Sequence, residues 1–238
     1  MSKAWEPADA RTRAPWVVVP MLNESESISR VVSDLREHFD HVLCVDDGST
    51  DDSAELAELA GAHVLRHPIN LGQGAALQTA FDYLSRQTAA THAVTFDADG
   101  QHLATDARAM LDVAAAEDLD VVLASRFQGR SEDMPLGRRV VLRAAIWFSR
   151  RTSGLPLTDT HNGLRVLSRR AFGTIRLHQN RMAYASELES AIVRHGLSWT
   201  EVPATVLYTE YSRRKGQRNI NAVNIVFDLA LQRLRHVP

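Results

Sequence analysis

Cysteine is almost missing from the sequence: Cys44, inside an apolar stretch typical of a strand, is the only one. A single thiol excludes a disulfide framework and a zinc site built from cysteines, and it fits a reducing compartment. Long apolar runs are missing too, because no 18 consecutive residues are uncharged and apolar. Residues 1–15 carry acidic and basic side chains where a signal peptide needs apolar ones. We therefore expect a chain that is neither secreted nor membrane-spanning.

The sequence patterns of several common architectures are absent. It contains no internal repeat, no low-complexity tract and no clear linker. The stretch Asn70–Ala76 is typical of a tight loop entering a helix, where glycines let the backbone approach a ligand, but it lacks the G-x-G-x-x-G spacing and residue 77 is leucine. A Rossmann dinucleotide site and a P-loop are both disfavoured. The predicted organisation is an N-terminal arm at 1–15 followed by a single domain at 16–238.

The net charge of −2 over 238 residues hides a strong asymmetry. Residues 1–133 hold 23 acidic and 10 basic residues, whereas residues 134–238 hold 6 acidic and 17 basic ones. Between Asp133 and Glu187 the only acidic residue is Asp159. Such asymmetry indicates that the second half meets an anionic partner, such as nucleic acid, a phosphorylated ligand or a membrane surface. The alternative is a solvated basic face without a ligand.

Short β-rich runs alternate with helical patterns over the first 125 residues, which predicts an α/β fold with a mostly parallel sheet flanked by helices. Ligands of such sheets bind at the carboxyl ends of the strands. The predicted strands are Trp16–Val19, His41–Val45, Ala62–Leu65, His92–Phe96 and Asp120–Ala124. The predicted helices are Ser27–Phe39, Ser53–Ala60, Gly74–Arg86 and Thr105–Ala116.

The second half has a different pattern, with two amphipathic helices predicted toward the C-terminus. In the helix Leu136–Ser153, three arginines share one stripe beside a broad apolar side, which is typical either of a helix at a lipid surface or of one packed on its own core. The mostly apolar helix Ile220–Leu234 is expected to be buried, interfacial, or docked on a small membrane-protein partner. The other predicted elements are a polar loop at Arg126–Pro135, a strand at Gly163–Leu167, a helix at Ala185–His195 and a strand at Trp199–Leu207.

Two carboxylates follow the fourth predicted strand, in the sequence Phe96–His102. Asp97 and Asp99 are two residues apart, and the glycine that follows them makes this segment of the backbone more flexible. Both carboxylates can therefore supply oxygen to one hard divalent cation, with Gln101 as a further oxygen donor. Because neither cysteine nor clustered histidine competes, Mg²⁺ or Mn²⁺ is favoured over Zn²⁺. The alternative is a turn in which aspartate caps the backbone.

Adjacent carboxylates, Asp46 and Asp47, follow the second predicted strand. A carboxylate at this position can accept hydrogen bonds from a base or a ribose. Ser49, Thr50 and Asp51 are assigned instead to capping of the next helix. Capping does not explain two carboxylates before the glycine, so the pair is a candidate nucleoside site.

Polar residues also end the first predicted strand, in the sequence Pro20–Glu24. Asn23 and Glu24 either open the following helix or face the same ligand as the carboxylates after the second strand. The carboxyl ends of parallel strands meet at one edge of a sheet. We therefore place these residues in the candidate site.

Taken together and in this order, the polar motifs at the strand ends resemble those of inverting family-2 glycosyltransferases with a GT-A-type fold. The motifs are Pro20–Glu24, Asp46–Asp51, Asn70–Ala76 and Asp97–His102. Three later segments are similar to the branch of dolichyl- or polyprenyl-phosphate sugar synthases. They are Ser125–Phe127, Asp159–Arg165 and Arg213–Gln217. The likeness covers about residues 16–220.

The resemblance implies a nucleotide-sugar-binding half at 16–125 and an acceptor- and membrane-facing half at 126–238. The residues it implies for substrate binding are Pro20, Asn23, Glu24, Asp46, Asp47, Asn70, Gly74, Asp97, Arg138 and Arg165. The residues that it implies for catalysis are Asp99, Arg126, Arg139 and Arg213. It also implies Asp97, Asp99 and Gln101 as ligands of Mg²⁺ or Mn²⁺. Asp159 is expected to neutralise nearby arginines.

The expected function is inverting transfer of a sugar from a GDP- or UDP-sugar to a polyprenyl monophosphate, at the cytoplasmic face of the membrane. One alternative is a saccharide or other hydroxyl acceptor, for which Glu187 or Glu189 would be a possible base. A second alternative is a non-catalytic nucleotide-binding subunit. Nucleic acid is not an expected partner, because the acidic first half opposes phosphate-backbone binding.

Overall fold

A seven-stranded sheet organises the part of the chain that the computed structural model describes, which is residues 13–128, 155–159, 162–179 and 183–207. The strand order is β3-β2-β1-β4-β6-β5-β7, and β6 alone runs antiparallel, between β4 and β5. The strands are β1 (Trp16–Met21), β2 (His41–Asp46), β3 (His63–Arg66), β4 (His92–Thr95), β5 (Val121–Ser125), β6 (Arg165–Ser168) and β7 (Trp199–Pro203). The mostly parallel sheet expected from the sequence is confirmed.

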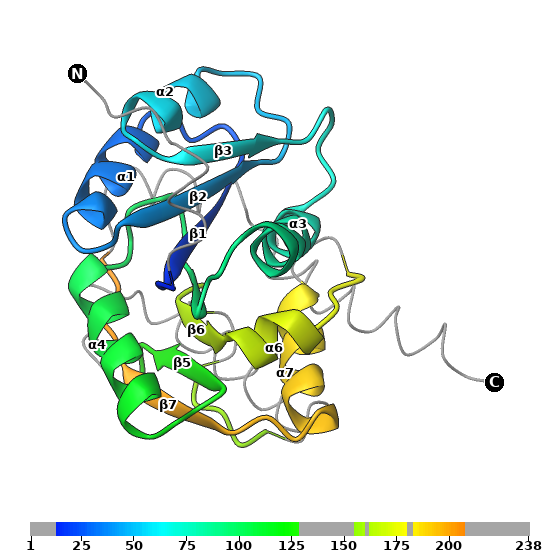
Figure 1. The fold of residues 1–238 in the computed structure, drawn as a ribbon. Coiled ribbons are helices and arrows are strands. Elements are labelled where there is room, and N and C mark those ends of the chain that lie inside the picture. Colours follow the sequence, from blue (N-terminus) through cyan, green and yellow to red (C-terminus); the bar gives the residue numbers. More distant parts are fainter. Residues whose placement is uncertain (1–12, 129–154, 160–161, 180–182, 208–238) are drawn as a thin grey trace, which may run out of the picture.

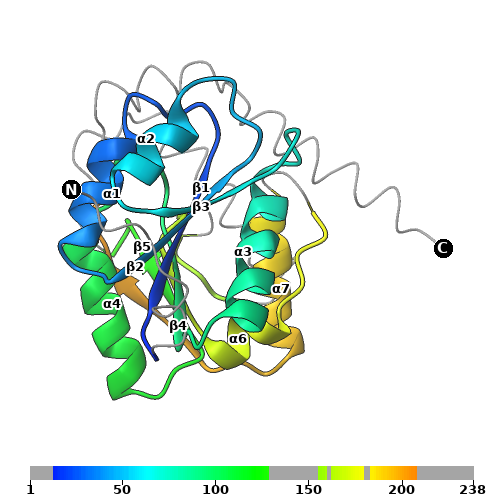
Figure 2. The same cartoon turned by 45° about the horizontal axis from the view of Figure 1, so that its top comes forward.

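Helices cover both faces of the sheet, with α1, α2 and α4 on one face and α3, α6 and α7 on the other (Figures 1 and 2). The helices are α1 (Ile28–Arg36), α2 (Ser53–Leu59), α3 (Gln73–Gln87), α4 (Ala104–Ala116), α6 (Arg169–Thr174) and α7 (Tyr184–Arg194). No helix among the described residues is both long and apolar enough to cross a membrane.

Side-chain alternation along the strands divides the core into two layers. In β1, Trp16 and Val18 join the cluster beneath α3 and α7, whereas Val17 and Val19 join the cluster beneath α1 and α4. Successive residues of a strand point to opposite faces, so a strand buried on both sides is apolar throughout. This double burial fixes the strand register and therefore the positions of the loops that follow the strands.

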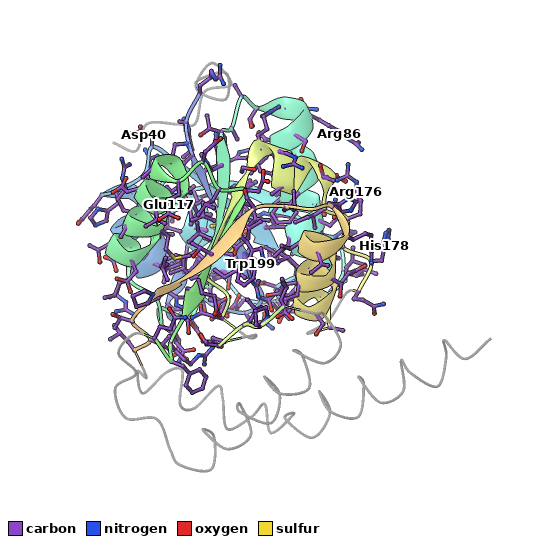
Figure 3. All side chains as sticks on the ribbon, turned by 90° about the horizontal axis from the view of Figure 1, so that it is seen from below. Asp40, Arg86, Glu117, Arg176, His178 and Trp199 are labelled. Atoms are coloured by element: carbon purple, nitrogen blue, oxygen red, sulfur yellow. The ribbon has the colours of Figure 1, made fainter. Side chains whose placement is uncertain are left out.

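The edge where the strands begin is opposite to the edge that carries the sequence motifs. Figure 3 shows residues of this edge: Asp40 precedes β2, Trp199 opens β7, and Arg86 and Glu117 lie at the ends of α3 and α4. Arg176, which follows α6, is labelled in the same view. The loops after β1, β2, β4 and β5, which carry the candidate site, belong to the other edge.

The structure departs from the predicted elements mainly in the second half. Helix α6 was not predicted, because its six residues are too few to show a helical period. The strand predicted at Gly163–Leu167 begins later, at Arg165, and the one predicted to reach Leu207 ends at Pro203. The helices predicted at 136–153 and 220–234 lie outside the described residues, as does most of the N-terminal arm.

Candidate active site

Asp46 and Asp47, at the end of β2, are both buried. Asp47 accepts hydrogen bonds from the backbone amides of Leu71 and Gly72, at 2.9 and 2.7 Å, and from Nδ1 of His67 at 2.8 Å. The carboxylate therefore holds the loop between β3 and α3 against the end of β2. This brings the predicted nucleoside residue and the predicted glycine-containing loop together.

The loop after β1 is tied to the loop after β2 through Asn23. The backbone N–H of Asn23 donates to Oγ of Ser49, and the side-chain Oδ1 of Asn23 accepts from the backbone N–H of Thr50, both at 2.9 Å. The predicted capping by Ser49 and Thr50 is therefore wrong, because the neighbouring loop supplies their partners. Asn23 has a φ of 52°, a left-handed conformation that asparagine tolerates. Asn23 thus joins two site loops.

Glu24 is buried where α1, α2 and the loop after β4 meet. Its amide donates to Oγ of Ser53 at 2.7 Å, and Oγ of Ser27 donates to the carbonyl of Ala98 at 2.8 Å. Asp51 accepts from the amide of Ser53, the first residue of α2, at 3.1 Å, although the N-cap position of α2 is held by Asp52. These bonds fix the first-strand motif against the Asp97–Asp99 loop.

Asp97 and Asp99 follow β4 as an electrostatically coupled pair. Burial alone would raise the pKa of Asp97, but a hydrogen bond from His102 and the positive charges of Arg165 and Arg126 lower it. Burial, and then the negative charge of Asp97, raise the pKa of Asp99 to about 6. The fold thus holds two carboxylates together against their mutual repulsion.

This donor set fits a hard divalent cation. The two carboxylates supply only oxygen, and a cation between them would offset the repulsion that raises the pKa of Asp99. Among the described residues, no group of three or more His, Cys, Asp or Glu side chains is placed to hold a metal ion by itself. A cation held by this pair alone would keep positions for water and for phosphate oxygens. The backbone of Gln101 donates to Asp99 at 3.1 Å.

Gly163 and His102 fix the direction of the Asp97 carboxylate. A methyl group on Gly163 would overlap both carboxylate oxygens of Asp97, so this close approach requires glycine. The carbonyl of Gly163 accepts from Oγ1 of Thr95 at 2.6 Å. His102 donates from Nε2 to Asp97 at 3.1 Å, and its ring packs edge-on against Phe96. Both residues act by orienting a candidate metal ligand.

Arg126, at the end of β5, forms a buried ion pair with Asp159. Its Nε lies 2.6 Å from Oδ2 of Asp159, and the two side chains are 7% and 1% exposed. Glu201 of β7 accepts from the amides of Thr158 and Asp159 and so fixes the loop that carries the carboxylate. The prediction that Asp159 neutralises an arginine is confirmed.

Arg165, predicted to bind substrate, is a buried residue of β6. Its guanidinium carbon lies 5.5 Å from the centre of the Tyr184 ring. Its charge acts on Asp97 from within the protein, which lowers the pKa of that carboxyl group. Arg165 therefore favours the ionised form of Asp97, and its contact with substrate stays a prediction.

Gly74 and Glu187 both serve packing around the start of α3. A methyl group on Gly74 would overlap the carbonyl oxygen of Gln179, so helix packing requires glycine here. Oε2 of Glu187 accepts from the amides of His178 and Gln179, each at 2.8 Å. Glu187, which the sequence left as a possible base for a hydroxyl acceptor, therefore binds backbone amides.

Three of the predicted arginines, Arg138, Arg139 and Arg213, lie outside the described residues. The last described residue, Leu207, donates from its amide to the carbonyl of Gln101 at 2.8 Å. The chain therefore passes the Asp97–Asp99 loop six positions before Arg213.

Residues 16–176 match the model of the family described as glycosyl transferase family 2. This match covers more than half of the chain and contains both aspartate motifs.

The chain belongs to glycosyl transferase family 2.

Relatives of this glycosyltransferase extend the comparison. It is 28% identical to the UDP-N-acetylglucosamine–dolichyl-phosphate N-acetylglucosaminyltransferase of Methanococcus voltae, over 93% of this chain and 97% of the relative. It is 31% identical to the polyprenol monophosphomannose synthase of Mycolicibacterium smegmatis, over 92% and 86%. Glucosyl-3-phosphoglycerate synthase from Mycobacterium tuberculosis, solved with Mn²⁺ and UDP-glucose, is similar in fold, with a TM-score of 0.65, 20% identity and coverage of 87% and 78%. The expected GT-A-like fold is confirmed.

The Gly163→Ala variant of this glycosyltransferase should lose most of its activity. The new methyl group would displace the Asp97 carboxylate, and an error of about 1 Å in a catalytic group lowers rates roughly 100-fold. Steady-state transfer assays measure the loss. Gly173→Ala is the matched control, because a methyl group there meets no atom within 4 Å. Equal activity of the two variants would contradict the positioning of Asp97 by Gly163.

Proposed function

We propose that this glycosyltransferase transfers a sugar from a nucleotide-sugar to a polyprenyl monophosphate, with inversion at the anomeric carbon, as a peripheral protein at the cytoplasmic face of the membrane. Two relatives support this acceptor class, because one is named a dolichyl-phosphate N-acetylglucosaminyltransferase and the other a polyprenol monophosphomannose synthase. The basic composition of residues 134–238 suits an anionic acceptor.

The observation that carries the choice of acceptor is the environment of Glu187. A hydroxyl acceptor needs a base, whereas the second pKa of a phosphate monoester is near ~6, so its oxygen is already largely ionised at neutral pH. Of the two glutamates considered as base for a hydroxyl acceptor, Glu187 accepts at Oε2 from the amides of His178 and Gln179, and Glu189 is buried. This arrangement favours an acceptor that brings its own nucleophilic oxygen.

The proposed mechanism assigns the described carboxylates to the donor. Glu24 and Asp47, with Asp46 nearby, hold the nucleoside, and Asp97 and Asp99, with Gln101, hold Mg²⁺ or Mn²⁺. When bound, this cation stabilises the negative charge of the departing nucleoside diphosphate. His102 and Gly163 orient Asp97, and the charge of Arg165 favours its ionised form.

Arginines position the acceptor in this mechanism. A planar guanidinium binds phosphate through paired hydrogen bonds, and Arg126, Arg139 and Arg213 are assigned to phosphates of the donor or acceptor. Attack by the phosphate oxygen opposite the leaving diphosphate inverts the anomeric centre. The nucleoside diphosphate leaves with the electrons of the broken bond.

The Arg139→Ala variant tests the phosphate acceptor. Loss of one partner of a desolvated charge-assisted contact costs about 2 to 5 kcal/mol, which is at least tenfold in turnover of a short-chain polyprenyl phosphate. Donor binding should be almost unchanged. Arg139→Lys should not fully restore turnover, because lysine lacks the paired donors.

Arg176→Ala is the control for this measurement, because Arg176 is exposed and lies outside the sequence motifs. Removing an exposed arginine changes little. If Arg139→Ala and Arg176→Ala both kept full turnover, the lipid phosphate would not be held by Arg139. Transfer to a saccharide in place of a lipid phosphate would contradict the proposed function.

A further inference from the structure

Most hydrogen-bond acceptor positions of the Asp47 carboxylate are occupied by groups of the protein itself. Oδ1 accepts two hydrogen bonds, from Nδ1 of His67 at 2.8 Å and from the amide of Leu71 at 2.9 Å. Oδ2 accepts one, from the amide of Gly72 at 2.7 Å. An ionised carboxylate has about four acceptor positions, two on each oxygen. Within the described part of the chain, the contacts of Asp47 therefore leave one acceptor position, on Oδ2.

His67 is itself held in place by several hydrogen bonds, so its bond to Asp47 is part of the fold. A carboxylate only accepts, so Nδ1 carries the proton of the shared bond, and Nε2 lies 2.9 Å from Oγ1 of Thr79 on α3. The amide of His67 also donates to the carbonyl of Asp46 at 2.8 Å. The side chain is 9% exposed. The imidazole is thus fixed at both nitrogens and at its backbone, and a ligand cannot displace it without breaking these bonds.

Gly48 adds a second constraint on the same loop. It has a φ of +79°, and a methyl group there would overlap the backbone of Ile69 and Asn70. The loop after β3 is therefore packed against the turn that carries Asp47 and is also bonded to its side chain. Rotation of the Asp47 carboxylate toward a ligand would unpair the amides of Leu71 and Gly72.

From this count we infer that the base of the nucleotide-sugar is a uracil and that guanine is rejected. The inference rests on the proposed role of Asp47 in the donor site. Uracil presents a single imide N–H between two carbonyl oxygens, so it needs one acceptor position. Guanine presents a ring N–H beside an amino group, and pairing both with a carboxylate requires a free position on each oxygen. Oδ1 of Asp47 has none.

Asp46 does not supply the missing acceptor. Side chains alternate along β2, with Val45 in the core layer beneath α3 and Cys44 in the layer beneath α1. Asp46, the last residue of β2, continues on the α1 side, whereas Asp47 bonds to the α3 side through His67. Asp46 also accepts from the amide of Ser49 at 2.9 Å. The two carboxylates therefore do not form one joint acceptor surface.

Calorimetric titration of the full-length protein with UDP and with GDP, in the presence of Mn²⁺, tests this inference. UDP should bind about 10- to 100-fold more tightly, because a guanine group left unpaired against a charged partner loses a full charge-assisted hydrogen bond. Equal or tighter binding of GDP would overturn the choice of base and leave the proposed reaction intact. Binding of neither nucleotide would overturn both.

Variants of the imidazole and its partner connect the preference to His67. His67→Leu frees Oδ1 and should lower the ratio of UDP to GDP affinity several-fold. His38→Leu is the matched control, since His38 is exposed. Thr79→Val should shift the ratio in the same direction as His67→Leu, and Thr79→Ser, which keeps the hydroxyl, should restore it. An affinity ratio is independent of the fraction of folded protein, so unchanged ratios in His67→Leu and Thr79→Val would contradict the role of His67.

Discussion

The Asp99→Asn variant should transfer sugar at least about 1,000-fold more slowly than the natural chain, since loss of a metal-held stabilisation of several kcal/mol corresponds to that factor. The negative charge of Asp97 acts on Asp99 and raises the pKa of that carboxyl group. The substitution keeps the shape of the side chain but removes one of the two charges that would bind the cation. Initial rates with saturating donor, in Mg²⁺ and in Mn²⁺, measure the effect.

A thermal unfolding measurement separates loss of metal from loss of fold. Without metal, Asp99→Asn should unfold at the same or a higher temperature than the natural chain, because the repulsion from Asp97 is removed. The rise in unfolding temperature on adding Mn²⁺ and UDP should be smaller or absent. Asp112→Asn, on the exposed side of α4, is the control and should behave as the natural chain does. Full transfer activity of Asp99→Asn, or of the natural chain in excess EDTA, would exclude the proposed metal role.

The Asp159→Ala variant should lose about 3 to 5 kcal/mol of unfolding free energy, because it leaves a buried guanidinium without its carboxylate. Arg126 and Asp159 are 7% and 1% exposed, so water cannot replace the lost partner. Urea denaturation monitored by circular dichroism gives the value. The comparison is Glu58→Ala, which removes a partner of Arg66 at about half exposure and should cost less than about 1 kcal/mol. A similarly small loss in Asp159→Ala would show that the Arg126 pair is solvated.

A double substitution then distinguishes the two roles of Arg126. Replacement of both partners of a buried ion pair by apolar residues is often neutral for stability, so Arg126→Met with Asp159→Leu should recover much of the unfolding free energy. Turnover should stay low, because no guanidinium remains to contact a phosphate. If turnover returned together with stability, Arg126 would serve only the fold.

The regular part of the fold was predictable because its pattern is local. The first five strands and four helices follow from alternating apolar runs, and the structure places each within a few residues of its predicted range. Asp97 and Asp99 were singled out for a similar local reason, because both follow the fourth predicted strand directly, and their role as metal ligands stays a prediction. Asp159 was recognisable as the one acidic residue in a long basic segment.

The supporting residues were not predictable because their roles depend on distant partners. His67 lies 20 positions from Asp47, and Gly163 lies 66 positions from Asp97, so neither contact leaves a local pattern. A single histidine or glycine in a loop is a common occurrence. The capping prediction for Ser49 and Thr50 failed because of a contact from another loop. Their sequence is typical of a helix cap, but pairing of β1 with β2 brings the Asn23 loop close, and both residues bond to Asn23 instead.

The position of β6 determines the order in which this sheet can form during synthesis. β4 and β5 do not pair with each other; each pairs with β6, which begins 70 positions after the end of β4. Strands β1 to β4 can pair with one another once β4 has been synthesised, but one side of β4 stays unpaired until Arg165–Ser168 has left the ribosome. An open strand edge is a template for association with other chains. Slow elongation between Thr95 and Arg165 should therefore lower the yield of soluble protein, whereas the same delay after Pro203 should not.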